Sequence, residues 1–139
     1  MRLNKVISVF LGGAMFTFGF LKFFNPFKGW YSVQIESSQL GQMSYALGII
    51  GELVIGMALL GLVRYRSRVS FETYMYVSIV ASIAVIVMMS TGIYVHLHPN
   101  VPVDVLPLKI KPPFIPLIFL LAAFANIVIL FKNRHTANV

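Results

Sequence analysis

The chain contains no cysteine among its 139 residues, and only 11% of the residues are charged. The lack of cysteine excludes disulfide scaffolds, thiolate metal sites and dithiol redox chemistry on this polypeptide. Water-soluble domains carry about 25% charged residues, so less than half of the usual surface charge is present. A small soluble fold exposes a large fraction of its residues to water, and this chain has too few ionisable groups to cover such a surface. An ordinary soluble domain and a disordered tail are both excluded.

Apolar sequence takes the place of the missing charge: 58% of the residues are hydrophobic and the mean hydropathy is +0.85. A membrane helix needs about 20 predominantly apolar residues, and four stretches meet this condition, at about 6–24, 41–63, 74–95 and 114–131. Runs of this length without alternation are helical, because backbone in contact with lipid must satisfy its own hydrogen bonds. We predict an all-α fold, with residues 1–139 forming one integral membrane domain, a four-helix bundle in the lipid bilayer.

Basic residues are divided unevenly between the two sides of such a bundle. Cytoplasmic segments near membrane helices carry an excess of lysine and arginine, so we predict that both termini and the 64–73 loop are cytoplasmic. The net charge of +7 is then explained by topology, and no nucleic-acid partner is expected. Four crossings place these residues on the cytoplasmic side: Arg2, Lys5, Arg64, Arg66, Arg68, Lys132 and Arg134; the other side has Lys22, Lys28, Lys109 and Lys111.

The two connections on the outer side differ in composition. Residues 25–40 alternate between polar and apolar side chains around Tyr31, which permits a short strand, but a surface-lying turn of helix fits equally well. Residues 96–113 hold five of the seven prolines, too many for a helix interior. We therefore predict an extended, stiff, proline-rich cap over the outer mouth of the bundle.

Glu52 is an acid placed near the middle of the second predicted span. An ionised acid at the bilayer centre costs about 2.5–3.5 kcal/mol, while each leucine, isoleucine or valine favours insertion by about 0.3–0.6 kcal/mol. The apolar residues around Glu52 are numerous enough for the segment to insert. Glu52 is therefore expected to face the interior of the bundle and to find a partner there.

Other polar residues lie in the same outer half of the bundle. Lys22 is near the outer end of the first span, Tyr45 is on the helical face of Glu52, and three more residues belong to the outer half of the third span. Simpler roles are also open: Lys22 reaches the headgroups, Glu52 only holds helices together, and a buried hydroxyl bonds its own helix backbone. The predicted ligand-binding set, in a pocket under the cap, is Glu52, Lys22, Tyr45, Thr91, Tyr94 and His96.

Histidines and an asparagine remain to be placed. His96 and His98 point apart on a helix and share a face only in an extended segment, where a third ligand from Asp104 or Glu36 would be needed for a metal site. We assign no metal to the chain. Asn126 follows a face of small residues on the fourth span, where we expect it to hydrogen-bond across helices in the inner half.

Two segments resemble the DoxX-like family of small four-helix bacterial membrane proteins. These are GFLKFF at residues 19–24 and the glycine-containing run around Glu52 at residues 48–61. The resemblance in hydropathy covers nearly the whole chain, and it implies a multi-pass protein of the bacterial inner (cell) membrane. Some relatives are associated with quinone-linked oxidation and others with oxidative stress. Only Lys22 and Glu52 match the family motifs closely enough to be carried over as its polar site.

Three classes of function remain open at this stage. The first is a subunit that binds a quinone or a similar small amphiphile, linked to membrane redox or stress metabolism. With no cysteine of its own, such a subunit would depend on a partner redox subunit for thiol chemistry, so catalysis by this chain alone is not expected. The second is a non-catalytic scaffold or assembly factor, working with a partner protein or as a homo-oligomer. The third is a small transporter or proton conductor, although no transporter-type repeat is evident.

Overall fold

The computed structural model describes residues 2–137, with side chains described through residue 134. Four long apolar helices dominate it: α1 (Arg2–Leu21), α3 (Gln42–Arg64), α4 (Phe71–Leu97) and α5 (Phe114–Ala137). Each of the four is long and apolar enough to cross a membrane. The predicted all-α fold with four long apolar helices is confirmed, and it is compatible with a helical membrane protein.

The helix ends follow from local chemistry that hydropathy does not capture. α4 begins three residues earlier than predicted because the Ser70 side chain accepts a hydrogen bond from the Thr73 backbone N–H, which caps the first turn. It ends at Leu97 because Pro99 disfavours helical backbone at the residue before it. α3 begins after Gly41, whose φ of +83° lies in the region that glycine tolerates best.

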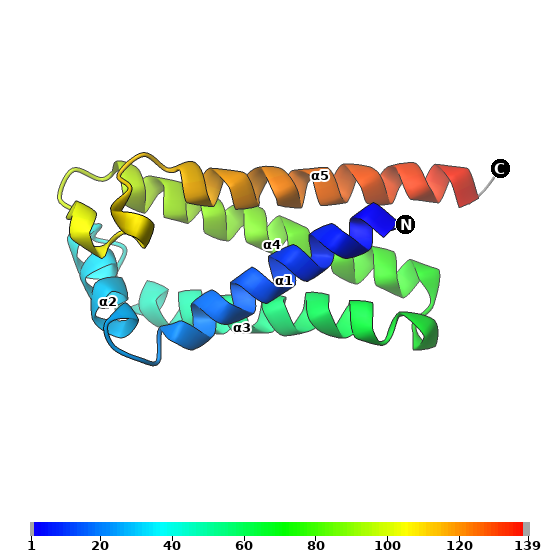
Figure 1. Ribbon diagram of the computed structural model, residues 1–139, viewed down its shortest axis with the longest axis horizontal. Helices are drawn as coiled ribbons and strands as arrows, with labels where there is room; N and C mark the ends of the chain where they lie inside the picture. Colours follow the sequence, from blue (N-terminus) through cyan, green and yellow to red (C-terminus); the bar gives the residue numbers. More distant parts are fainter. Residues whose placement is uncertain (1, 138–139) are drawn as a thin grey trace.

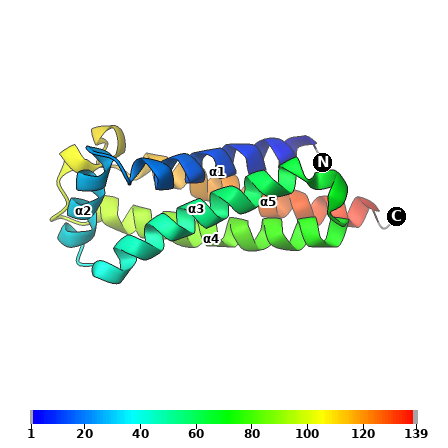
Figure 2. The same ribbon diagram turned by 90° about the horizontal axis from the view of Figure 1, so that it is seen from below.

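The four long helices run along one axis, and α1 crosses in front of α3 while α4 and α5 lie side by side (Figures 1 and 2). Their shared core is formed by apolar residues of all four helices. The described start of α1, the described end of α5 and the α3–α4 connection lie at the same end of the bundle (Figure 1). The assignment of this end to the cytoplasm rests on the basic residues and stays a prediction. The buried core residues are Leu11, Met15, Ile55, Leu59, Ala81, Val85, Met89, Phe119 and Ala123.

Glycines set the close packing of α1 against α3. A Cβ atom added to Gly56 would lie 2.6 Å from the backbone nitrogen of Phe16, so the two helices touch backbone to backbone here. A Cβ at Gly19 would lie 3.1 Å from the Glu52 Cβ. Small residues permit this approach between membrane helices, and the contact brings the end of α1 over the middle of α3.

The two connections predicted for the outer side form a layer at the opposite end of the bundle, called here the outer end (Figure 1). Residues 27–37 form the short helix α2 (Phe27–Ser37), so the helical alternative for this connection is correct. This segment forms a helix and not a strand because Tyr31 and Ile35, four residues apart, are buried on one common helix face. No strand occurs within residues 2–137.

The proline-rich segment lies beside α2 at this end, and it is not extended throughout. It contains two 3₁₀ turns, η2 (Val103–Val105) and η3 (Pro107–Lys109). The Lys111 ammonium holds the segment in shape by donating to the backbone oxygens of His98 and Val101, at 2.7 Å each. The Gln34 side chain joins α2 to the segment by donating to the Val105 carbonyl.

Candidate functional site

Lys22 and Glu52 form an ion pair inside the outer half of the bundle. The Lys22 Nζ atom lies 2.6 Å from Glu52 Oε1 and 2.7 Å from Oε2, so one ammonium serves both carboxylate oxygens. Glu52 is only 6% exposed. The acid therefore faces inward as predicted, and Lys22 reaches it directly from the turn that follows α1 instead of extending to the headgroup layer.

Tyr31 of α2 completes this polar group, although it is not among the predicted site residues. Its ring centroid lies 3.9 Å from Lys22 Nζ, a cation–π contact. Its hydroxyl donates to the Ser44 carbonyl at 3.2 Å. The hydroxyl occupies space left open by Gly48, where an added Cβ would lie 1.9 Å from it. Burial and the nearby Glu52 charge raise the pKa of the Tyr31 phenol well above its ordinary value, so the phenol stays protonated.

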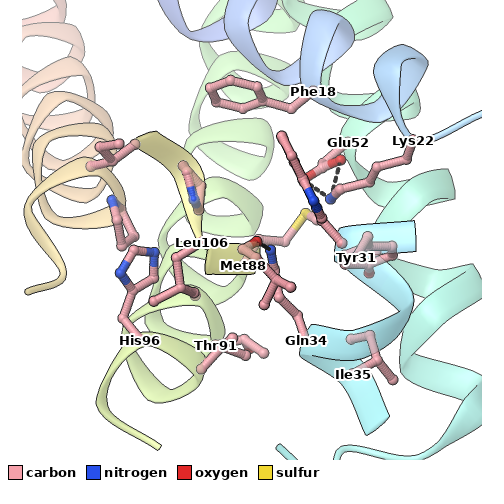
Figure 3. Close-up of a pocket in the computed structure, with 18 of the residues that line it drawn as sticks. Phe18, Lys22, Tyr31, Gln34, Ile35, Glu52, Met88, Thr91, His96 and Leu106 are labelled. Atoms are coloured by element: carbon pink, nitrogen blue, oxygen red, sulfur yellow. Dashed lines mark hydrogen bonds and ion pairs between the residues drawn. The ribbon is translucent and has the colours of Figure 1, made fainter. Parts of the chain in front are cut away.

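The ion pair forms part of the wall of a cavity of about 1130 Å³ (Figure 3). All five helices and the η2–η3 segment contribute to its lining. Apolar side chains such as Phe18, Met88, Leu106 and Phe119 make up most of the wall. A few polar groups interrupt this surface: Lys22, Tyr31, Gln34, Ser44, Glu52, Thr91, His96, Asp104 and Lys109.

His96 lies on the opposite side of the cavity from the Lys22–Glu52 pair, with Leu106 and Met88 between them in the view of Figure 3. The imidazole is buried, and its Nδ1 atom lies 3.3 Å from the Lys111 carbonyl oxygen. Thr91 also lines the cavity, but its hydroxyl donates to the Val87 carbonyl of its own helix. The cavity thus has two polar sides with an apolar middle.

Two predicted site residues, Tyr45 and Tyr94, do not line this cavity. The Tyr45 ring packs on the far side of Tyr31, with 4.9 Å between ring centroids. The Tyr94 hydroxyl donates to the Ser38 carbonyl, and its ring borders a shallow groove outside. Both tyrosines lie on the expected helix and in the expected half, but outside the lining of the cavity.

The two outer histidines also separate. The His98 Nδ1 atom accepts from the Asn100 backbone N–H, and the ring packs against Tyr94 instead of beside His96. Within the part of the chain that the structure describes, no three histidine, aspartate or glutamate side chains gather closely enough to hold a metal ion.

A second polar group lies in the inner half of the bundle, around Asn126. The Asn126 carboxamide accepts from Asn4 at 2.6 Å and donates to Ser82 at 3.1 Å and to Ser8 at 3.4 Å. The Tyr74 hydroxyl donates to the carboxamide oxygen of Asn4. This group, called here the Asn126 cluster, joins α1, α4 and α5 and fulfils the expectation of hydrogen bonds across helices.

Comparison of the chain with protein-family models, curated proteins and solved structures found no significant match.

Proposed function

We propose that this protein is a membrane subunit that binds a quinone, or an amphiphile of similar shape, in the outer cavity. The observation that carries the proposal is the Lys22–Glu52 ion pair in the wall of a large apolar cavity. Ionisable groups within membrane spans are expensive to bury and typically mark functional sites. A pair kept at this depth beside open volume is better explained by ligand binding than by packing alone.

The dimensions and chemistry of the cavity support a small amphiphile as the ligand. Binding pockets for small molecules measure about 300–1000 Å³ and combine apolar walls with a few placed polar groups. The cavity is slightly larger than this range, and Phe18, Tyr31 and Phe119 supply aromatic surface for a planar ring.

The charge balance favours an uncharged head group. Lys22 contacts both oxygens of Glu52 and the face of the Tyr31 ring, so its charge is already matched. An anionic ligand would have to compete with Glu52 for this ammonium. A neutral carbonyl-bearing head group can accept a hydrogen bond at one polar side of the cavity without breaking the pair.

Glu52→Gln tests the proposal because it keeps the shape of the side chain and removes its charge. We expect the purified variant in lipid nanodiscs to bind decylubiquinone about tenfold more weakly than the wild type, because without the carboxylate the Lys22 ammonium is no longer held in place in the cavity wall. Glu36→Gln, at an exposed position of α2, is the matched control and should bind as the wild type does. Unchanged affinity in Glu52→Gln would show that the proposed site is wrong.

We also propose membership of the DoxX-like family, on the two motifs around Lys22 and Glu52. Location in a bacterial inner membrane and a link to redox or stress metabolism belong to the same proposal. Because the chain has no cysteine, a partner redox subunit would carry out any thiol chemistry. A wild-type protein that bound no quinone would favour the scaffold function instead.

A further inference from the structure

The outer cavity is closed unequally on its two long sides. Between α1 and α5 the wall is shut by Phe18 and Phe119, whose rings meet edge to face with centroids 5.5 Å apart. Phe119 is buried, and Phe10 stacks on its ring from the inner direction, at 5.1 Å. No comparable aromatic contact is found between α3 and α4 among the described residues.

On the side between α3 and α4, the lining residues are open to the surroundings. Leu47 of α3 is 62% exposed and Val87 of α4 is 61% exposed, yet both line the cavity. Side chains that are both exposed and part of the wall stand at the rim of an opening. Leu47 lies five residues inside α3 and Val87 ten residues inside α4, which is roughly 8 Å and 15 Å from the outer helix ends. The opening therefore faces the bilayer and not the water.

A shallow groove continues the opening along the outside of α4. Its lining includes Leu40 and Thr91, which also line the cavity, so groove and cavity meet at these two residues. The hydroxyls in the groove are already engaged: Ser90 and Thr91 donate to their own helix, and Tyr94 donates to Ser38. With these donors occupied, the groove presents a surface that hydrocarbon can cover.

At about the depth of Val87, α3 and α4 meet through Gly51 and Met88. A Cβ atom added to Gly51 would lie 3.1 Å from the Met88 sulfur, so α3 and α4 are already in contact at this level. The gap is thus confined to the outer half of the two helices, where the polar residues of the cavity also lie.

We propose that this gap between α3 and α4 is a lateral passage, and that the hydrocarbon chain of the bound amphiphile extends through it into the bilayer. The inference rests on the proposed function for the head group and adds that the ligand carries a chain. Leu47 and Val87 then act as specificity residues for chain-bearing ligands, because each would contact the chain where it leaves the cavity.

The test compares two probes that share a ring and differ in the chain: decylubiquinone and the ring-only 2,3-dimethoxy-5-methyl-1,4-benzoquinone. In full-length protein in nanodiscs, Leu47→Trp and Val87→Trp should each weaken decylubiquinone binding about tenfold, because the larger side chain would overlap the space that the chain occupies. Binding of the ring-only probe should change less than about twofold, since the head-group contacts remain. Ile50→Trp and Val80→Trp, exposed positions of α3 and α4 outside the cavity lining, are the controls and should change neither affinity.

Equal weakening of both probes at the rim, or no change for decylubiquinone, would overturn the passage. A second measurement separates this failure from failure of the proposed function. A diazirine-bearing hexadecanol, which has an uncharged head group, should photolabel Leu106, which is buried and lines the cavity, in the wild type but not in Leu47→Trp/Val87→Trp. If neither quinone probe binds the wild type but Leu106 is labelled in this way, the passage stands and the quinone proposal falls. Absence of labelling in the wild type would contradict the passage itself.

Discussion

The Asn126 cluster and the Lys22–Glu52 site are both buried polar groups in an apolar bundle, but only one of them borders open space. In the inner half, Asn126 bonds to three side chains from two other helices, and none of these residues lines the outer cavity. In the outer half, Lys22 and Glu52 satisfy each other and still form part of the cavity wall.

This difference separates two uses of polarity in a membrane protein. Hydrogen bonds between buried side chains hold helices together and fix their register, and each contributes about 0.6 kcal/mol on average. A buried ion pair rarely adds stability beyond what apolar residues of the same size would give. The Asn126 cluster is therefore explained by a structural role, whereas the Lys22–Glu52 pair is better explained by a function.

The largest predicted effect comes from removing one half of the ion pair. Lys22→Met leaves Glu52 without its cation in an apolar wall, and breaking a buried pair in this way destabilises a protein by about 3–5 kcal/mol. The double variant Lys22→Met/Glu52→Met should recover most of this loss. Denaturant titration of the purified protein in mixed micelles measures the free energy of unfolding.

Lys28→Met is the control for this experiment, because Lys28 lies on the exposed part of α2. Its free energy of unfolding should stay within about 0.5 kcal/mol of the wild type. If Lys22→Met were as stable as Lys28→Met, the ion pair would be an exposed contact and the contrast between the two polar groups would disappear.

Hydropathy alone was sufficient to predict the four spans, because the requirement for about 20 apolar residues acts on each segment separately. The inward orientation of Glu52 was predictable for the same reason, since an acid facing lipid is too unfavourable to retain. Asn4 was missed, because the first span was expected to begin near residue 6 while α1 begins at Arg2. The bonding of Asn4 to Asn126 depends on how α1 packs against α5.

Tyr31 was not predictable from its own neighbourhood. Its position over Lys22 depends on the chain reversal between α1 and α2, which brings two residues nine apart into contact. Gly48 was a possible sign of the space that Tyr31 fills, but a glycine in a membrane helix usually indicates helix packing. Here the Tyr31 hydroxyl occupies the space beside Gly48. Tyr94 is the converse case: its helix and depth were predictable, but its place in the groove outside the cavity depends on neighbours that the sequence does not position.

The next largest effect is expected in the inner group. Asn126→Leu removes the partner of Asn4 and Ser82 inside a closed region, and leaving buried polar groups unsatisfied costs about 1–3 kcal/mol. Decylubiquinone binding should be unchanged, because the Asn126 cluster does not line the cavity. Unfolding and binding measured on the same nanodisc preparation test both statements. Thr17→Ala, at an exposed position of α1 outside both the cavity and the groove, should alter neither. Weakened binding in Asn126→Leu would mean that the two groups are coupled.

The smallest predicted effect concerns Tyr31, which lies beside the Lys22–Glu52 pair. Tyr31→Phe keeps the aromatic face beside Lys22 and removes the hydrogen bond to the Ser44 carbonyl, so it should destabilise the protein by about 1 kcal/mol at neutral pH. Burial raises the pKa of the Tyr31 phenol in the folded protein, so above the ordinary tyrosine pKa of about 10 the unfolded chain loses a proton that the folded chain keeps. The wild type therefore loses stability as the pH rises through this range, and the variant lacks that contribution. The stability difference between wild type and Tyr31→Phe, measured by denaturant titration at pH 7 and above pH 10, should shrink at the higher pH; a constant difference would mean that the phenol is not shielded in the folded protein.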